Sequence, residues 1–214
     1  IPWSVQTQDG NVAYYLYSRK HGDLERDYNF FHLEPGYFSQ GNGNFRDVLQ
    51  NRRNDVFFNP DSGAFNIIQF ASLIQADGYN PLSIEGVTFS YHCVHEPEDQ
   101  GLKRVLSEPF TPGMLARALE KAGMDVMEGI KGILKDSTVN IKARYGEGYW
   151  EDHFTYLYDL FDGYLSVFPD KKEEMLFEWK VPYFDSPARV VPRAEKHVID
   201  KNGNVRQFGA VRHT

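Results

Sequence analysis

The sequence predicts a mainly α fold, a helical bundle or an α/α barrel, with extended or β segments at both ends. Apolar residues follow helical spacing through the centre of the chain. In the first forty residues, aromatic and polar residues alternate instead, with Gly and Pro between them, which is typical of short strands. Long polar loops separate the helical segments, and such loops gather at one end of a helical domain and form a cleft.

These patterns divide the chain into three segments. Residues 1–40 are expected to be an extended or β lead-in, and residues 41–170 to form the helical portion with the candidate site. Residues 171–214 are expected to be an extended or β tail. Because no closing element is evident near the last residue, we expect the tail to continue into a larger protein.

Within the central segment, several helix ends can be assigned. We expect one helix from the N-cap Asn44 to Pro60 and a second from about Ser62 to the Asp77-Gly78 pair. Thr111-Pro112 is a typical helix start, since Thr can cap the helix and Pro suits its first position. The best periodic segment runs through Phe154, Leu157, Tyr158, Phe161, Leu165 and Phe168 and stops at Pro169.

The remaining segments have weaker patterns. The stretch from Tyr79 to Glu108 is interpreted as irregular because it carries Gly, Pro and an acidic patch. Met175–Val181 suggests a strand, and Asn202-Gly203 is a hairpin-turn signal.

Composition restricts the function classes. A net charge of −7 argues against a generic nucleic-acid binder, and no apolar run approaches the roughly 18 residues that span a membrane. The one cysteine, Cys93, excludes an internal disulfide and a cysteine-cluster zinc site. We therefore expect a cytoplasmic protein with neither a nucleic-acid nor a membrane partner. The aromatic fraction of 15% fits either a ring-rich core or stacking platforms for sugars.

The segment from Gly41 to Asp55 is the first candidate binding region. Gly41 and Gly43 allow the backbone to approach a ligand closely, and amide and guanidinium side chains follow them at high density. Asp47 and Gln50 lie one helical turn apart, so both can face one ligand. The alternative is an ordinary polar helix face with Arg–Asp pairs.

The second candidate region runs from Gly146 to His153. Acetal cleavage needs a carboxylic acid to protonate the leaving oxygen, and Glu147, Glu151 and Asp152 compete for that role. The neighbouring Tyr149 and Trp150 rings can lower the local polarity. Alternatively, these acidic side chains only stabilise the start of a helix. No metal site is expected, because the histidines lack convincing ligand spacing.

Two motifs in these regions resemble one family. Asn44-Phe-Arg-Asp47 with Gln50 resembles the Phe-Arg-Asp-x-x-Gln motif of the cellobiose and chitobiose phosphorylases, which are inverting glycoside phosphorylases. Gly146-Glu-Gly-Tyr-Trp-Glu-Asp152 resembles the Gly-rich Trp-Asn-Asp segment that carries their general acid, with Glu151 in place of Asn. The resemblance covers two short patches and implies part of an (α/α)₆ barrel, which in the family stands beside a β-sandwich domain.

The resemblance also implies roles for individual residues. Arg46 would bind phosphate or the −1 sugar, Asp47 would bind sugar hydroxyls, and Asp152 would be the general acid while phosphate attacks the anomeric carbon directly. The predicted site therefore consists of catalytic Asp152 and Glu151, with the substrate-binding residues Arg46, Asp47, Gln50, Asn44 and Trp150. It needs no metal and no cofactor, since inorganic phosphate is a co-substrate.

Two other functions remain open on the sequence alone. A glycoside hydrolase would need a second carboxylate roughly 6.5–9.5 Å from the acid, for which Glu147 or Asp159 are candidates. A non-catalytic sugar-binding or structural module would need no positioned acid. The expected partners are an oligosaccharide and phosphate, and further segments of the same polypeptide or a second copy of the chain in a homodimer.

Overall fold

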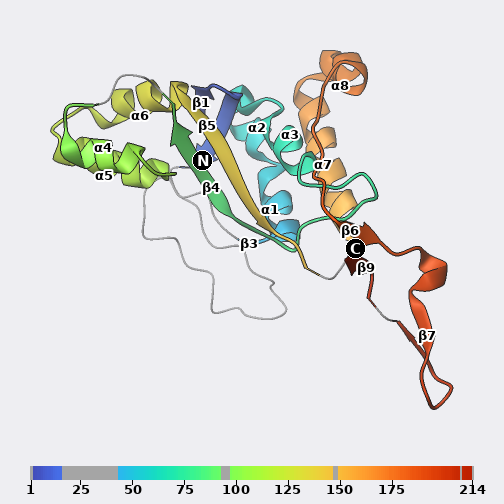
Figure 1. Ribbon diagram of the computed structural model, residues 1–214. Coiled ribbons are helices and arrows are strands. Elements are labelled where there is room, and N and C mark those ends of the chain that lie inside the picture. Colours follow the sequence, from blue (N-terminus) through green and yellow to red (C-terminus); the bar gives the residue numbers. More distant parts are fainter. Residues whose placement is uncertain (1, 16–42, 93–96, 147–148, 208, 214) are drawn as a thin grey trace.

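The computed structural model describes residues 2–15, 43–92, 97–146, 149–207 and 209–213. Two long antiparallel strands, β4 (Ser83–Tyr91) and β5 (Ser137–Arg144), cross the middle of the molecule (Figure 1). The short strand β3 (Gly43–Asn44) joins the free edge of β4 to give the order β3-β4-β5. A separate hairpin pairs β1 (Pro2–Thr7) with β2 (Gly10–Tyr15).

A β-bulge sets the side-chain pattern of β4. The register shifts between Ile84 and Gly86, and Gly86 has a φ of 137°, in the region that favours glycine. As a result the buried residues Ile84, Val87 and Phe89 are spaced by three and then two, not by two throughout. Because of the bulge, the apolar residues of β4 do not follow the every-second-residue pattern by which a strand is recognised in a sequence.

The first hydrophobic core lies between the strands and one group of helices. Here α4 (Gln100–Leu106), α5 (Pro112–Lys121) and α6 (Val126–Lys135) pack against the β1–β2 hairpin and the β4–β5 pair. Each helix begins with a capping side chain: those of Asp99, Thr111 and Asp125 each accept a hydrogen bond from the backbone N–H three residues later. The caps explain why these helices begin where they do.

The second core is built by helices on the other side of β4 and β5. Its elements are α1 (Phe45–Arg52), α2 (Asp55–Phe58), a 3₁₀ turn (Pro60–Ser62), α3 (Phe65–Ala71) and α7 (Asp152–Val167). The rings of Phe45 and Phe70 meet edge to face, with 5.7 Å between their centroids. The packing holds the first turn of α1 close to the start of α7.

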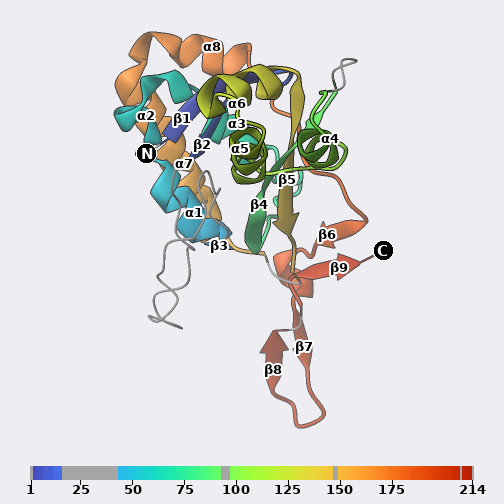
Figure 2. The same ribbon diagram turned by 90° about the vertical axis from the view of Figure 1, so that its left-hand side faces the viewer.

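The C-terminal part consists of short elements. They are a 3₁₀ turn (Pro169–Lys171), α8 (Lys172–Phe177), β6 (Ala188–Val190), a 3₁₀ turn (Arg193–Glu195), β7 (His197–Ile199), β8 (Val205–Gln207) and β9 (Val211–His213). Strand β6 pairs with β9, and β7 pairs with β8 in a hairpin that projects from the rest of the molecule (Figure 2). As expected, Asn202-Gly203 lies in the turn of that hairpin, where Gly203 has a φ of 79°.

Two side chains of the segment after α3, Gln75 and Asp77, bind the tail through hydrogen bonds. Gln75 donates to the Ala188 carbonyl at 2.7 Å and accepts from the Ser186 hydroxyl at 2.9 Å. Asp77 accepts from the Val190 N–H at 2.7 Å. Burial alone would raise the pKa of Asp77, but the hydrogen bonds that its carboxylate accepts hold that pKa below its usual value.

The expected fold class is wrong. The described residues form an α/β mixture with several small sheets, and no (α/α)₆ barrel is present among them. The error comes from β4, which lies in the stretch interpreted as irregular because of its Gly, Pro and acidic residues, and from β5, whose alternation was not recognised. A β pair thus separates two helix groups that the sequence had suggested were continuous.

Three segments also differ from expectation. The helix expected from about Ser62 to the Asp77-Gly78 pair is α3, which spans only Phe65–Ala71. The single helix expected from Asn44 to Pro60 is interrupted at Arg53 and Asn54, and this turn lets the Asp55 carboxylate accept a buried hydrogen bond from Asn66 at 2.8 Å. The strand expected over Met175–Val181 begins as the end of helix α8, where a Lys171–Glu174 ion pair of 2.7 Å has helical spacing. Within the described residues, none of the helices has the length and apolar character needed to cross a bilayer.

Candidate functional site

The two regions singled out in the sequence meet where α1 and α7 begin. Arg46, in the first turn of α1, places Nη1 3.7 Å from Oδ2 of Asp152, the first residue of α7. Its Nε lies 3.5 Å from Oδ1 of Asp47. The Arg46 guanidinium therefore lies beside two carboxylates that come from the two motifs.

The exposure of these groups leaves the cluster open to solvent. The side chain of Asp47 is 17% exposed, that of Arg46 35% and that of Asp152 47%. The Asn44 amide donates to the other Asp47 oxygen at 3.3 Å. A ligand approaching from solvent would meet Asp152 and Arg46 first, with Asp47 and Asn44 behind them.

Backbone pairing fixes the α1 side of the site. Asn44 ends β3 opposite Ser83 and has an extended conformation, with φ −60° and ψ 140°. Phe45 follows, with its N–H bonded to the Leu82 carbonyl at 3.0 Å and its side chain fully buried. Asn44 occupies the expected N-cap position, but its side chain makes no capping hydrogen bond and bonds to Asp47 instead.

A buried amide fixes the α7 side. Asn80 is fully buried, and its amide group donates to the carbonyls of Trp150 at 3.0 Å and Gly78 at 3.1 Å. The Trp150 ring stacks on the His153 ring, with centroids 5.6 Å apart and planes 17° from parallel. His153 in turn lies 5.1 Å from the Phe45 ring, which links the two halves of the site.

Among the titratable side chains of this site, His153 has a strongly shifted pKa. It is 5% exposed, and this burial lowers the pKa of its imidazole to about 4. The Asp152 carboxylate opposes that shift, and the Arg46 guanidinium adds to it. The imidazole is therefore neutral near pH 7. Among the described residues, its Nδ1 has no hydrogen-bond partner.

The other predicted site residues lie near the cluster without a defined contact to it. Gln50 is half-buried on α1, and Glu151 is exposed immediately before α7, where its side chain makes no capping bond. Gly41 and Glu147 lie outside the described residues. Asp159, a candidate second carboxylate, is paired with Arg53 at 2.7 Å, two turns along α7 from Asp152.

Sequence reasoning did not select His153 or Asn80. His153 lies seven residues before Leu160 and eleven before Tyr164, and all three are buried in α7. That spacing places His153 on the face of α7 that packs into the core. The sequence spacing could therefore have predicted that His153 is buried. Nothing in the sequence indicated that Asn80 would be buried against the Trp150 backbone.

The arrangement suits a ligand that carries hydroxyl or anionic oxygen atoms. A guanidinium binds phosphate or vicinal hydroxyls through its planar N–H groups, and a carboxylate accepts hydrogen bonds from hydroxyls. In the part of the chain that the structure describes, no group of three or more His, Cys, Asp or Glu side chains is placed to hold a metal ion. Comparison with protein-family models, curated proteins and solved structures found no match to this chain.

Proposed function

We propose that this chain contributes the sugar- and phosphate-binding site of an enzyme that cleaves a β-linked oligosaccharide by inverting phosphorolysis. The observation that supports it best is the 3.7 Å contact between Arg46 and Asp152. These residues belong to two motifs that lie far apart in the sequence and that both resemble segments of one phosphorylase family. Nothing about the order of the motifs along the chain requires this contact.

In the proposed reaction, Asp152 donates a proton to the departing glycosidic oxygen. Phosphate attacks the anomeric carbon from the face opposite Asp152, so the C–O bond breaks as a new C–O bond to phosphate forms. Arg46, which contacts Asp152, binds the −1 sugar on the side of the acid. Because phosphate is already an anionic nucleophile, no catalytic base is required. The products are a sugar 1-phosphate with inverted configuration and a shortened oligosaccharide.

The neighbouring residues have supporting roles in this proposal. Behind Arg46, the Asp47 carboxylate accepts hydrogen bonds from sugar hydroxyls, and the Asn44 amide donates to them. Gln50 lies one turn further along α1 and adds a second amide. Trp150 provides a ring beside the acid, and Glu151 is a second carboxylate next to it.

A non-catalytic sugar-binding module is the second candidate. The 47% exposure of the Asp152 side chain favours it, because acid catalysts are usually enclosed by the protein and a binding module needs no enclosed acid. The hydrolase alternative has less support, since Asp159 is paired with Arg53.

One experiment separates these functions. The protein is incubated with β-linked gluco- and N-acetylglucosamine oligosaccharides, with and without inorganic phosphate, and the products are identified by NMR. Sugar 1-phosphate that forms only with phosphate supports phosphorolysis. Reducing sugar released equally in both conditions would indicate a hydrolase. Line broadening of the oligosaccharide signals without any product, unchanged in Asp152→Asn, would indicate a binding module.

A further inference from the structure

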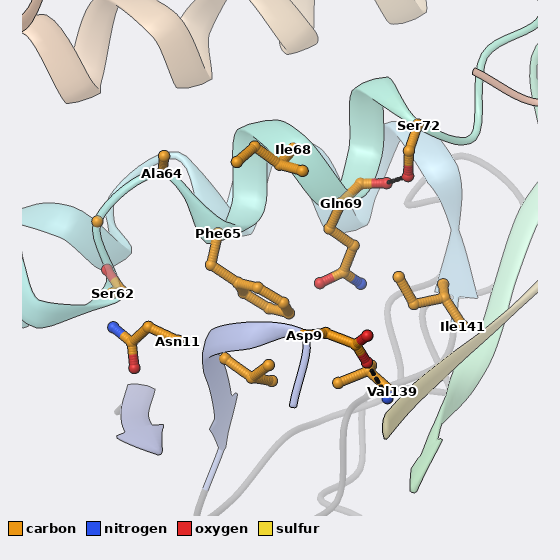
Figure 3. A pocket seen from close by; sticks show the side chains of 12 residues that line it. Asp9, Asn11, Ser62, Ala64, Phe65, Ile68, Gln69, Ser72, Val139 and Ile141 are labelled. Carbon is orange, nitrogen blue, oxygen red and sulfur yellow. Dashed lines mark hydrogen bonds between the residues drawn. The ribbon is translucent and has the colours of Figure 1, made fainter. Parts of the chain in front are cut away.

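A pocket of about 440 Å³ lies beside helix α3 (Figure 3). One wall is α3, and the other is formed by the β1–β2 hairpin and β5. This volume is within the range of small-molecule sites in proteins. The pocket is lined by Asp9, Asn11, Val12, Ser62, Gly63, Ala64, Phe65, Ile68, Gln69, Ser72, Val139 and Ile141, none of which belongs to the Arg46–Asp152 site.

The walls of the pocket are mainly apolar. Phe65 and Ile68 come from α3, while Val139 and Ile141 are alternate residues of β5 and so point to the same face of the strand. Val12, which is 2% exposed, comes from β2. These side chains offer a ligand hydrophobic contact on both sides.

Gln69 is a polar residue on this mainly apolar surface. It is 8% exposed, and its carboxamide points into the pocket between the two walls (Figure 3). The hydrogen bond recorded for Gln69 uses its backbone carbonyl, which accepts from Ser72, and among the described residues its carboxamide has no partner. A carboxamide has both an N–H donor and a C=O acceptor, so a ligand in the pocket that supplied an acceptor and a donor would engage both of its ends.

The other polar groups of the pocket are already engaged. An oxygen of the Asp9 carboxylate accepts from the Val139 N–H at 2.6 Å, and Asp9 is exposed. The Asn11 amide donates to the Asp61 carbonyl. Gln69 is therefore the group best placed to determine which ligand the pocket accepts.

We propose that this pocket binds a small, mostly apolar molecule with a carboxamide-like edge, in which an N–H donor lies beside a C=O acceptor. The ligand carbonyl accepts from the Gln69 NH₂ group, and the ligand N–H donates to the Gln69 carbonyl oxygen. The apolar part of the ligand lies between Phe65 and Ile141. The proposal does not depend on the function of the Arg46–Asp152 site.

Two probes of nearly equal shape test the proposal. The amide 2-naphthamide has both the donor and the acceptor, whereas 2-acetylnaphthalene replaces the NH₂ group by a methyl group and keeps only the acceptor. Dissociation constants are measured by ¹⁵N–¹H NMR titration of the chain. We expect shifts of backbone signals around Val12, Val139 and Ile141, with the amide bound about five- to tenfold more tightly than the ketone.

Variants test whether the Gln69 carboxamide causes the preference for the amide probe. Gln69→Leu has a similar volume but no hydrogen-bonding group, so the preference for the amide should be lost or reversed; Gln69→Met is a second variant of the same kind. Gln6→Leu makes the same replacement on an exposed position of β1 and should keep the preference. The proposal is wrong if neither probe shifts the pocket signals, if the unaltered protein binds both probes equally, or if Gln69→Leu keeps the preference for the amide.

Discussion

The buried histidine beside the candidate site should make the stability of the protein depend on pH in a defined window. The pKa of His153 is about 4 in the folded protein, compared with 6.5 for an unperturbed imidazole. Between these values the unfolded chain takes up a proton that the folded protein does not. The free energy of unfolding therefore falls as the pH is lowered from 6.5 towards 4, and His153 has no such effect above this window.

The size of the effect follows from the shift. Each unit of difference in pKa corresponds to about 1.4 kcal/mol, so the full window gives a loss of about 3 kcal/mol. A loss of that size is a large part of the 5–15 kcal/mol that usually stabilises a folded domain. His153→Phe keeps a ring between Phe45 and Trp150 but cannot take up a proton, so it should lack this contribution.

Urea unfolding measured at several values between pH 4.5 and 7.5 tests this reasoning. Subtracting the values of His153→Phe from those of the unaltered protein removes the contribution of other titrating groups. The difference should fall by more than about 1 kcal/mol for each pH unit below 6. A difference that stays constant across the window, or an NMR titration of His153 with a midpoint near 6.5, would refute the assignment of a buried neutral imidazole.

Two further predictions concern stability near the site. Gly78→Ala should cost more than Gly123→Ala in urea unfolding: both have positive φ, which costs about 1–2 kcal/mol for alanine, but only at Gly78 would a Cβ meet a side chain, 3.0 Å from Cε2 of Tyr149. Equal losses would show that the Tyr149 contact has no effect. Arg46→Gln and Arg53→Gln should each change the unfolding free energy by less than about 1 kcal/mol, because their ion pairs are partly exposed. A much larger loss for Arg46→Gln alone would mean that Arg46 supports the fold and not a ligand.

Local signals in the sequence predicted two of the helices, α5 and α7, well. Thr111 caps α5 as expected, through a hydrogen bond from the Met114 N–H at 3.2 Å. The best periodic segment corresponds to α7, which spans Asp152–Val167. These successes depend on residues close together in the chain, where capping and helical spacing act directly.

The architecture was not predicted because it depends on pairing between distant segments. Strand β4 has its alternation interrupted at Gly86, and β5 begins directly after α6. Neither stands out alone, yet their pairing separates the two helix groups. A preference for helices, inferred from each segment separately, therefore gave the wrong fold class.

For the candidate site, the sequence identified the groups that meet but not what holds them together. Arg46, Asp47 and Asp152 were selected from two motifs, and the structure places them in one cluster. Asn80 and His153, which position the start of α7, were missed. Their importance comes from burial and from contacts with Trp150 and Phe45, which a single sequence does not reveal.

The most direct test of the proposed function compares two aspartates on the same helix. Asp152→Asn removes the proposed acid beside Arg46, whereas Asp159→Asn removes the carboxylate paired with Arg53, two turns away. The measurement is the rate of phosphate-dependent sugar 1-phosphate formation from a β-linked oligosaccharide. The proposal predicts a rate at least about a hundredfold lower for Asp152→Asn and nearly unchanged for Asp159→Asn. Equal rates for the two variants would contradict the assignment of Asp152 as the general acid.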